Sequence, residues 1–97
     1  MKIYLPHLHY TVFVRPFKKV PEGLTIAEAF VKKLDNHSCA IYLPKKNEPG
    51  DLSHELIHVL QFICESRNMD FCLEREHMAY LMHYLFGRIW LKRNPWK

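Results

Sequence analysis

The sequence has few of the residues that cross-link or interrupt small proteins. It contains three cysteines without a Cys-x-x-Cys pair, three glycines, and no repeated or low-complexity segment. An odd number of irregularly spaced cysteines favours reduced thiols over a disulfide framework. No apolar run approaches the length of a membrane-spanning helix, and the N-terminal stretch is too polar for a signal peptide. We therefore expect a cytoplasmic protein without a membrane anchor.

The composition is that of one small folded domain. The 97 residues are 48% hydrophobic and 13% aromatic, which indicates a globular chain with a thin core. The formal charge of +4 is modest and is not concentrated in a strong basic patch, so nucleic acid is not the expected partner. We expect a single α+β domain that spans residues 1–97.

The N-terminal residues predict two strands. Residues 3–5 and 8–15 are rich in β-branched and aromatic side chains, and Pro6 separates them. His7 and His9 are two residues apart, so on a strand they would share one face. Such a pair can bind metal, but we expect two solvent-facing polar positions, because a better metal motif occurs later in the chain.

A short helix and a further strand are predicted next. Thr25-Ile26-Ala27-Glu28 has the pattern of a capping box, which predicts a helix to about Leu34. The apolar residues 39–43 then predict a strand, and Pro44 ends it. Cys39–Leu43 is predicted either as an edge strand whose hydrogen-bonding edge is free or as a plain core strand.

The most informative stretch is His54-Glu55-Leu56-Ile57-His58, an HExxH motif. Residues four apart lie on one face of a helix, so both imidazoles can bind one metal ion and Glu55 can reach a water on it. By average residue usage, a chance occurrence in so short a chain is on the order of one in a few hundred. Asp51 is the predicted N-cap of a helix over residues 52–66.

That helix is amphipathic at about 100° per residue. His54, His58, Gln61 and Glu65 lie opposite an apolar arc, so we expect one face to pack on the core and the other to present the histidines. The apolar arc consists of Leu52, Leu56, Val59, Leu60 and Ile63.

A catalytic zinc site needs a third protein ligand and an open position for water. One known arrangement places a histidine six residues after the second, beyond a glycine turn, but here Cys64 lies there inside a continuing helix. The other arrangement uses a glutamate on the following helix, which we predict over about residues 71–91. Glu76 follows His58 by eighteen residues, and Glu74 is rotated about 200° away from it. Glu76 is the predicted third ligand.

Three other side chains remain alternatives for the third ligand, namely His77, His83 and, more weakly, Cys72. Tyr80 and His83 follow Glu76 by four and seven residues on the same helical face. They are candidates for orienting a ligand or for stabilising developing negative charge on a substrate. Ordinary amphipathic surface explains either residue equally well.

The pattern of His54–His58 followed by Glu76-His-Met-Ala79-Tyr80 resembles the gluzincin branch of the zincin metallopeptidases. The resemblance covers about residues 51–86, and the small size resembles minimal gluzincins and small zincin-like proteins encoded by phages and prophages. It implies a small sheet packed on an HExxH helix and a following glutamate helix. Larger gluzincins often carry an aspartate four residues after the ligand glutamate, where this chain has Tyr80.

The resemblance implies a zinc-dependent peptidase. Zinc would be held by His54, His58 and Glu76, with Glu55 as general base and Tyr80 or His83 stabilising the oxyanion. A peptide or protein substrate would bind in extended form along the predicted edge strand. The basic C-terminal tail would close the cleft, as in some minimal gluzincins. The alternative is a catalytically weak zincin-fold metal-binding protein that acts as a protein-interaction module.

Overall fold

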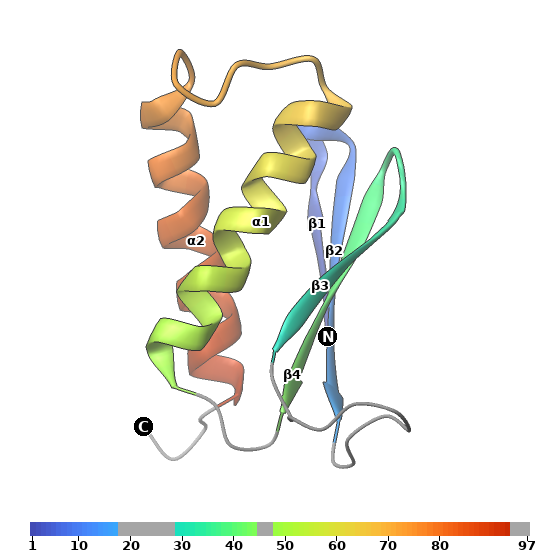
Figure 1. Ribbon diagram of the computed structural model, residues 1–97, viewed down its shortest axis with the longest axis vertical. Coiled ribbons are helices and arrows are strands. Elements are labelled where there is room, and N and C mark those ends of the chain that lie inside the picture. Colours follow the sequence, from blue (N-terminus) through green and yellow to red (C-terminus); the bar gives the residue numbers. More distant parts are fainter. Residues whose placement is uncertain (18–28, 45–47, 94–97) are drawn as a thin grey trace.

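A mixed four-stranded sheet with two helices on one face makes up the described part of the chain (Figure 1). The structure is a computed structural model that describes residues 1–17, 29–44 and 48–93. The expected α+β class is confirmed. The elements are β1 (Lys2–Leu5), the 3-10 helix η1 (Pro6–Leu8), β2 (Tyr10–Phe17), β3 (Phe30–Asp35), β4 (Ser38–Pro44), α1 (Pro49–Ser66) and α2 (Arg75–Arg93).

The strands lie in the order β1-β2-β4-β3, so β4 is in the interior of the sheet. It pairs in parallel with β2 and antiparallel with β3, while β1 pairs antiparallel with β2. The prediction that Cys39–Leu43 is an edge strand is therefore wrong. Its unbroken apolar sequence is typical of a strand in the interior of a sheet. Every residue of β4 is buried except the half-buried Tyr42.

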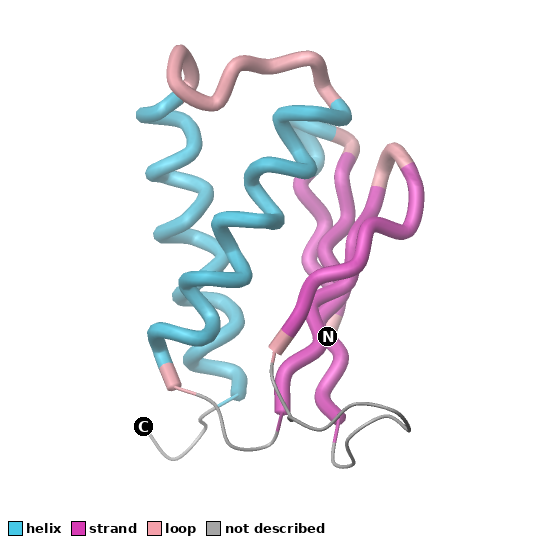
Figure 2. The backbone as a smooth tube through the Cα atoms, viewed as in Figure 1, coloured by secondary structure: helices cyan, strands magenta, loops and turns pink. Residues whose placement is uncertain are grey.

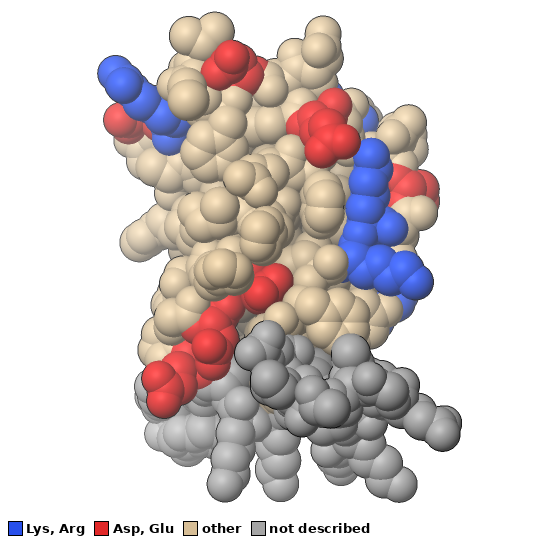
Figure 3. Space-filling view, in the orientation of Figure 1, with Lys and Arg blue, Asp and Glu red and all other residues tan. Residues whose placement is uncertain are grey.

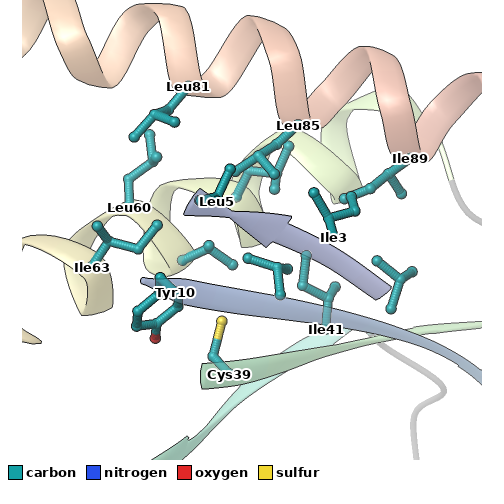
Figure 4. Packing of buried hydrophobic residues seen from close by; sticks show 14 of the residues in the cluster. Ile3, Leu5, Tyr10, Cys39, Ile41, Leu60, Ile63, Leu81, Leu85 and Ile89 are labelled. Carbon is teal, nitrogen blue, oxygen red and sulfur yellow. The ribbon is translucent and has the colours of Figure 1, made fainter. Parts of the chain in front are cut away.

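The core lies between the sheet and the helices. β1 and β2 alternate between buried residues and more exposed ones, as strands with one covered face do. In Figure 4, α2 turns Leu85 and Ile89 towards Leu5 and Ile3 of β1, and it turns Leu81 towards Leu60 of α1. α1 packs against β3, β4 and α2, and Figure 2 shows the two helices side by side. Each helix therefore covers a different half of the sheet.

Residues 30–35 form strand β3, so the short helix predicted for this segment is wrong. The strand turns back on β4, and the Asp35 carboxylate holds the turn by accepting hydrogen bonds from the His37 N–H (2.6 Å) and the Ser38 hydroxyl (2.9 Å). The capping-box pattern at residues 25–28 suggested a helix, but pairing with β4 decides the conformation of residues 30–35. The capping box predicted at residues 25–28 lies outside the described residues.

The connection between β1 and β2 differs from the extended chain that the sequence predicted. Pro6 begins the 3-10 helix η1, and the backbone of His9 is left-handed, with φ of 48°. The second strand therefore starts at Tyr10. As a result, His7 and His9 do not share a strand face.

Arg67, just beyond the end of α1, connects three segments. Its Nε donates to the carbonyl of Leu8 (2.7 Å), and its Nη2 donates to the carbonyl of His9 (2.9 Å) and to Nδ1 of His37 (2.8 Å). The guanidinium carbon also lies 5.9 Å from the centroid of the Tyr10 ring. These contacts anchor the C-terminal end of α1 to the sheet.

Both ends of α1 are capped. Glu48 is the N-cap, and Asp51, which was predicted in that role, is the third helical residue and accepts the Glu48 N–H (2.9 Å). A proline takes the first helical position, where its missing N–H costs nothing. At the other end Asn68 has φ of 53°, and the Met69 N–H donates to the Cys64 carbonyl (2.8 Å), which is a Schellman motif.

α2 begins at Arg75, later than residue 71, where the sequence placed its start. The Asp70 carboxylate accepts the N–H groups of Cys72 (2.9 Å) and Leu73 (3.1 Å), so it holds a separate turn before the helix. Neither helix in the described residues is long and apolar enough to cross a membrane.

Candidate metal centre

His54 and His58 lie one turn apart on the exposed side of α1. The centroids of their rings are 5.1 Å apart. Two imidazoles on one tetrahedral zinc ion have centroids about 5 Å apart, because each ligating nitrogen lies about 2.0–2.1 Å from the metal. The spacing of the two rings is therefore compatible with a shared ion.

Gln61 supports His58 from the next turn of α1. Its side-chain Oε1 lies 3.2 Å from Nδ1 of His58. An amide oxygen only accepts, so in the neutral ring Nδ1 carries the proton and Nε2 keeps its lone pair for a metal. A ligand histidine usually makes this kind of hydrogen bond through its other nitrogen. The sequence placed Gln61 on the histidine face but did not reveal that it supports His58. The signal available for this role was that Gln61 follows His58 by three residues.

Glu55 lies at the border between the histidine face and the core. It is rotated about 100° from His54 and about 60° from His58, which is the relation in any HExxH helix. Its side chain is only 8% exposed and is engaged in an interaction within the fold. The carboxylate is therefore largely shielded from bulk water.

α1 is acidic although the chain as a whole is basic. Residues 49–66 contain Asp51, Glu55 and Glu65 and no lysine or arginine. Figure 3 shows a strip of acidic side chains at the lower left of this face, while other acidic side chains lie at the top and beside the main group of Lys and Arg. The Glu65 carboxylate lies 4.0 Å from Nζ of Lys33, which brings the end of the histidine face beside β3. Negative charge on α1 favours a cation at the histidine pair.

The structure does not bring Glu76, the predicted third ligand, to the histidine pair. Glu76 is exposed in the first turn of α2. Within residues 1–17, 29–44 and 48–93, no three His, Cys, Asp or Glu side chains meet where a metal could bind. The side chains packed between α1 and α2 are mainly apolar, and they separate Glu76 on α2 from the histidine pair on α1. Glu76 as a ligand therefore stays a prediction. The groove between the helices is lined by Ile57, Leu60, Phe71, Arg75, Met78, Ala79 and Met82.

The alternative ligands and the expected oxyanion stabilisers also lie elsewhere. Tyr80 is 72% exposed and lines a pocket next to β1 together with His77. His83 is exposed and lines a shallow groove along α2, and Cys72 is exposed in the turn before that helix. In the described ranges, neither these two histidines nor Cys72 joins the histidine pair of α1.

Cys39 and Cys64 are buried free thiols. Burial raises the pKa of Cys39 to about 11, and burial also raises the pKa of Cys64. Both thiols are therefore neutral at pH 7, whereas metal ligation and nucleophilic attack need the thiolate. The Cys64 sulfur lies 3.4 Å from that of Met78, so these cysteines belong to the packing of the core.

Comparison with known proteins does not assign a function to this chain, so the geometry of the site has to support the assignment. No family model, no curated protein and no solved structure matches the chain. The resemblance implied the tail Arg93–Lys97 as a cover for the cleft, and residues 94–97 of this tail lie outside the described residues.

Proposed function

We propose that this protein is a zinc-dependent peptide hydrolase of the zincin type, with His54 and His58 as zinc ligands and Glu55 as general base. The main support is a pair of exposed imidazoles, 5.1 Å apart, on an acidic helix. The hydrogen bond of Gln61 to Nδ1 of His58 leaves Nε2 for the metal. Imidazole and carboxylate ligands together suit zinc among the common divalent ions.

Bound at this pair, zinc supplies Lewis acidity, which lowers the pKa of a bound water to about 7 and polarises a peptide carbonyl. His54 and His58 fix the position of the metal on one turn of α1. Glu55 accepts the proton of the attacking water and returns it to the leaving amine. Because Glu55 is only 8% exposed, few bulk waters compete for that proton.

The edge strand next to this site is β3. It pairs only with β4 among the described strands, and it packs against α1. Lys33 of β3 lies 4.0 Å from Glu65 at the end of the histidine face. An extended peptide substrate would add to the sheet at β3 and so pass the histidine pair.

A second candidate is a zincin-fold metal-binding protein that holds a partner protein without cleaving it. The observation in its favour is that no third His, Cys, Asp or Glu joins the pair within the described residues. Catalytic zinc usually has three protein ligands. A site with two ligands on this chain would take the third from the bound partner.

Zinc content tests the metal assignment. We expect His54→Ala and His58→Ala each to lose about one equivalent of zinc relative to the wild type, because each change removes one of two fixed ligands. The measurement is elemental analysis of purified protein after dialysis. His9→Ala, which removes an exposed histidine outside the motif, is the control and should not change the zinc content. Full retention by both α1 variants would contradict the assignment.

The same measurement on Glu76→Ala separates the two candidate functions. A hydrolase with Glu76 as third ligand loses the zinc equivalent in this variant. A site completed by a partner retains it. Glu65→Ala, at another exposed carboxylate, is the control for a general loss of acidic charge.

Gln61→Ala is expected to weaken zinc binding about 10-fold to 100-fold, because Nδ1 of His58 loses its acceptor. Gln61 is exposed, so the fold should not change. Competition with a chromophoric chelator measures the affinity, and Gln61→Glu, which keeps an acceptor, should restore it. Equal affinity of Gln61→Ala and the wild type would show that the hydrogen bond does not support the site.

A further inference from the structure

A second pair of histidines meets where α2 packs beside η1. His7 of η1 and His77 of α2 are 70 residues apart in the sequence, yet their Nε2 atoms are 3.2 Å apart. The ring centroids are 5.4 Å apart, and the ring planes are tilted by 38°. No motif connects the two residues, so the packing of α2 on β1 brings them together.

The distance between the two Nε2 atoms matches the spacing that one metal ion imposes. Two nitrogens bound at about 2.0–2.1 Å in a tetrahedral arrangement are about 3.3 Å apart. The same distance suits a single N–H···N hydrogen bond between two neutral rings. A metal ion can therefore take the place of the shared proton at nearly the same distance between the two nitrogens.

The surroundings of the pair also fit a metal. The Glu74 carboxylate lies 3.9 Å from Nδ1 of His77, which is too far for a hydrogen bond but places negative charge beside the pair. The pair borders a pocket of about 310 Å³, which has room for waters or a small ligand at the remaining coordination positions. The residues that line it are Tyr4, Leu5, Pro6, His7, His77, Tyr80, Leu81 and Tyr84.

We propose that His7 and His77 form a second metal site, which binds a divalent transition metal such as Zn²⁺ and fastens α2 to the end of β1. Two imidazole donors favour zinc, copper or nickel over calcium and magnesium. The site is separate from His54 and His58, because no three metal-binding side chains meet in the part of the chain that the structure describes. The pair exists only in the folded chain, so metal binding stabilises the fold.

The test uses the full-length chain without a polyhistidine tag and with His54→Ala and His58→Ala, so that the HExxH pair cannot contribute. We expect this parent to bind about one equivalent of Zn²⁺ in equilibrium dialysis. Adding His7→Ala or His77→Ala should abolish that binding. Zn²⁺ should raise the melting temperature of the parent and leave that of the two further variants unchanged.

Two controls keep the outcome clear. His9→Ala removes a histidine two residues from His7 that contacts Tyr4 instead, and it should retain the metal. His77→Gln preserves bulk at a half-buried position, and circular dichroism confirms the fold of each variant. A parent that binds no Zn²⁺, or binding that survives the loss of both histidines, would overturn the proposal. Either result leaves the HExxH assignment intact, because that pair is tested separately by His54→Ala.

Discussion

Replacement of Glu55 by glutamine is expected to lower peptide hydrolysis by about 10²–10⁴-fold while zinc stays bound. The amide cannot accept the proton of the attacking water, whereas His54 and His58 are unchanged. Glutamine is nearly the same size as glutamate, so it fills the 8% exposed position without a cavity. Initial rates of cleavage of fluorescently labelled, unfolded casein measure the effect, with zinc content determined on the same preparations.

Glu65→Gln is the matched control, because it makes the same chemical change at an exposed carboxylate of the same helix. It should keep both hydrolysis and zinc. Equal rates for Glu55→Gln and the wild type would show that Glu55 is not the base. A wild type that binds zinc but cleaves nothing, together with a Glu76→Ala variant that retains zinc, would favour the metal-binding interaction protein.

Leu56→Ala is expected to lower the free energy of unfolding by about 2–5 kcal/mol, through lost burial and the cavity left behind. Leu56 lies within the HExxH motif, is fully buried and belongs to the core cluster. Domains are stable by only about 5–15 kcal/mol in total. The melting temperature should therefore fall by about 8–40 °C in a chain of this length. Thermal unfolding followed by circular dichroism measures the change.

Ile57→Ala is the control for this core substitution. It removes the same number of carbon atoms from the neighbouring residue, but Ile57 is 40% exposed on the side of α1 that faces α2. Its loss of stability should be much smaller than that of Leu56→Ala. An equal loss in both variants would mean that burial of Leu56 does not anchor the motif helix.

The motif helix and its two faces could be predicted because both depend on residues close in sequence. The predicted apolar arc is buried in α1, and His54 and His58 are exposed on another side. Helical geometry alone sets the four-residue spacing that puts the two imidazoles on one face. The α+β class followed from the same local patterns, and so did the strand at residues 39–43.

Strand order depends on hydrogen bonds between distant segments, so local patterns did not settle it. Cys39–Leu43 was predicted at an edge and lies in the interior, because β2 and β3 both pair with it. Residues 30–35 carry an apolar period that is compatible with a helix, and they are a strand because β4 offers them a partner.

What the sequence determined by itself is the HExxH helix, a short-range structure whose histidine pair needs no other segment. What only the tertiary structure decided is which side chains from different segments meet. It brought His7 and His77 together across 70 residues, and it left Glu76 away from the histidine pair. The physical reason is that apolar packing sets how α2 lies against α1 and β1, and residue spacing within a helix holds no information about that packing.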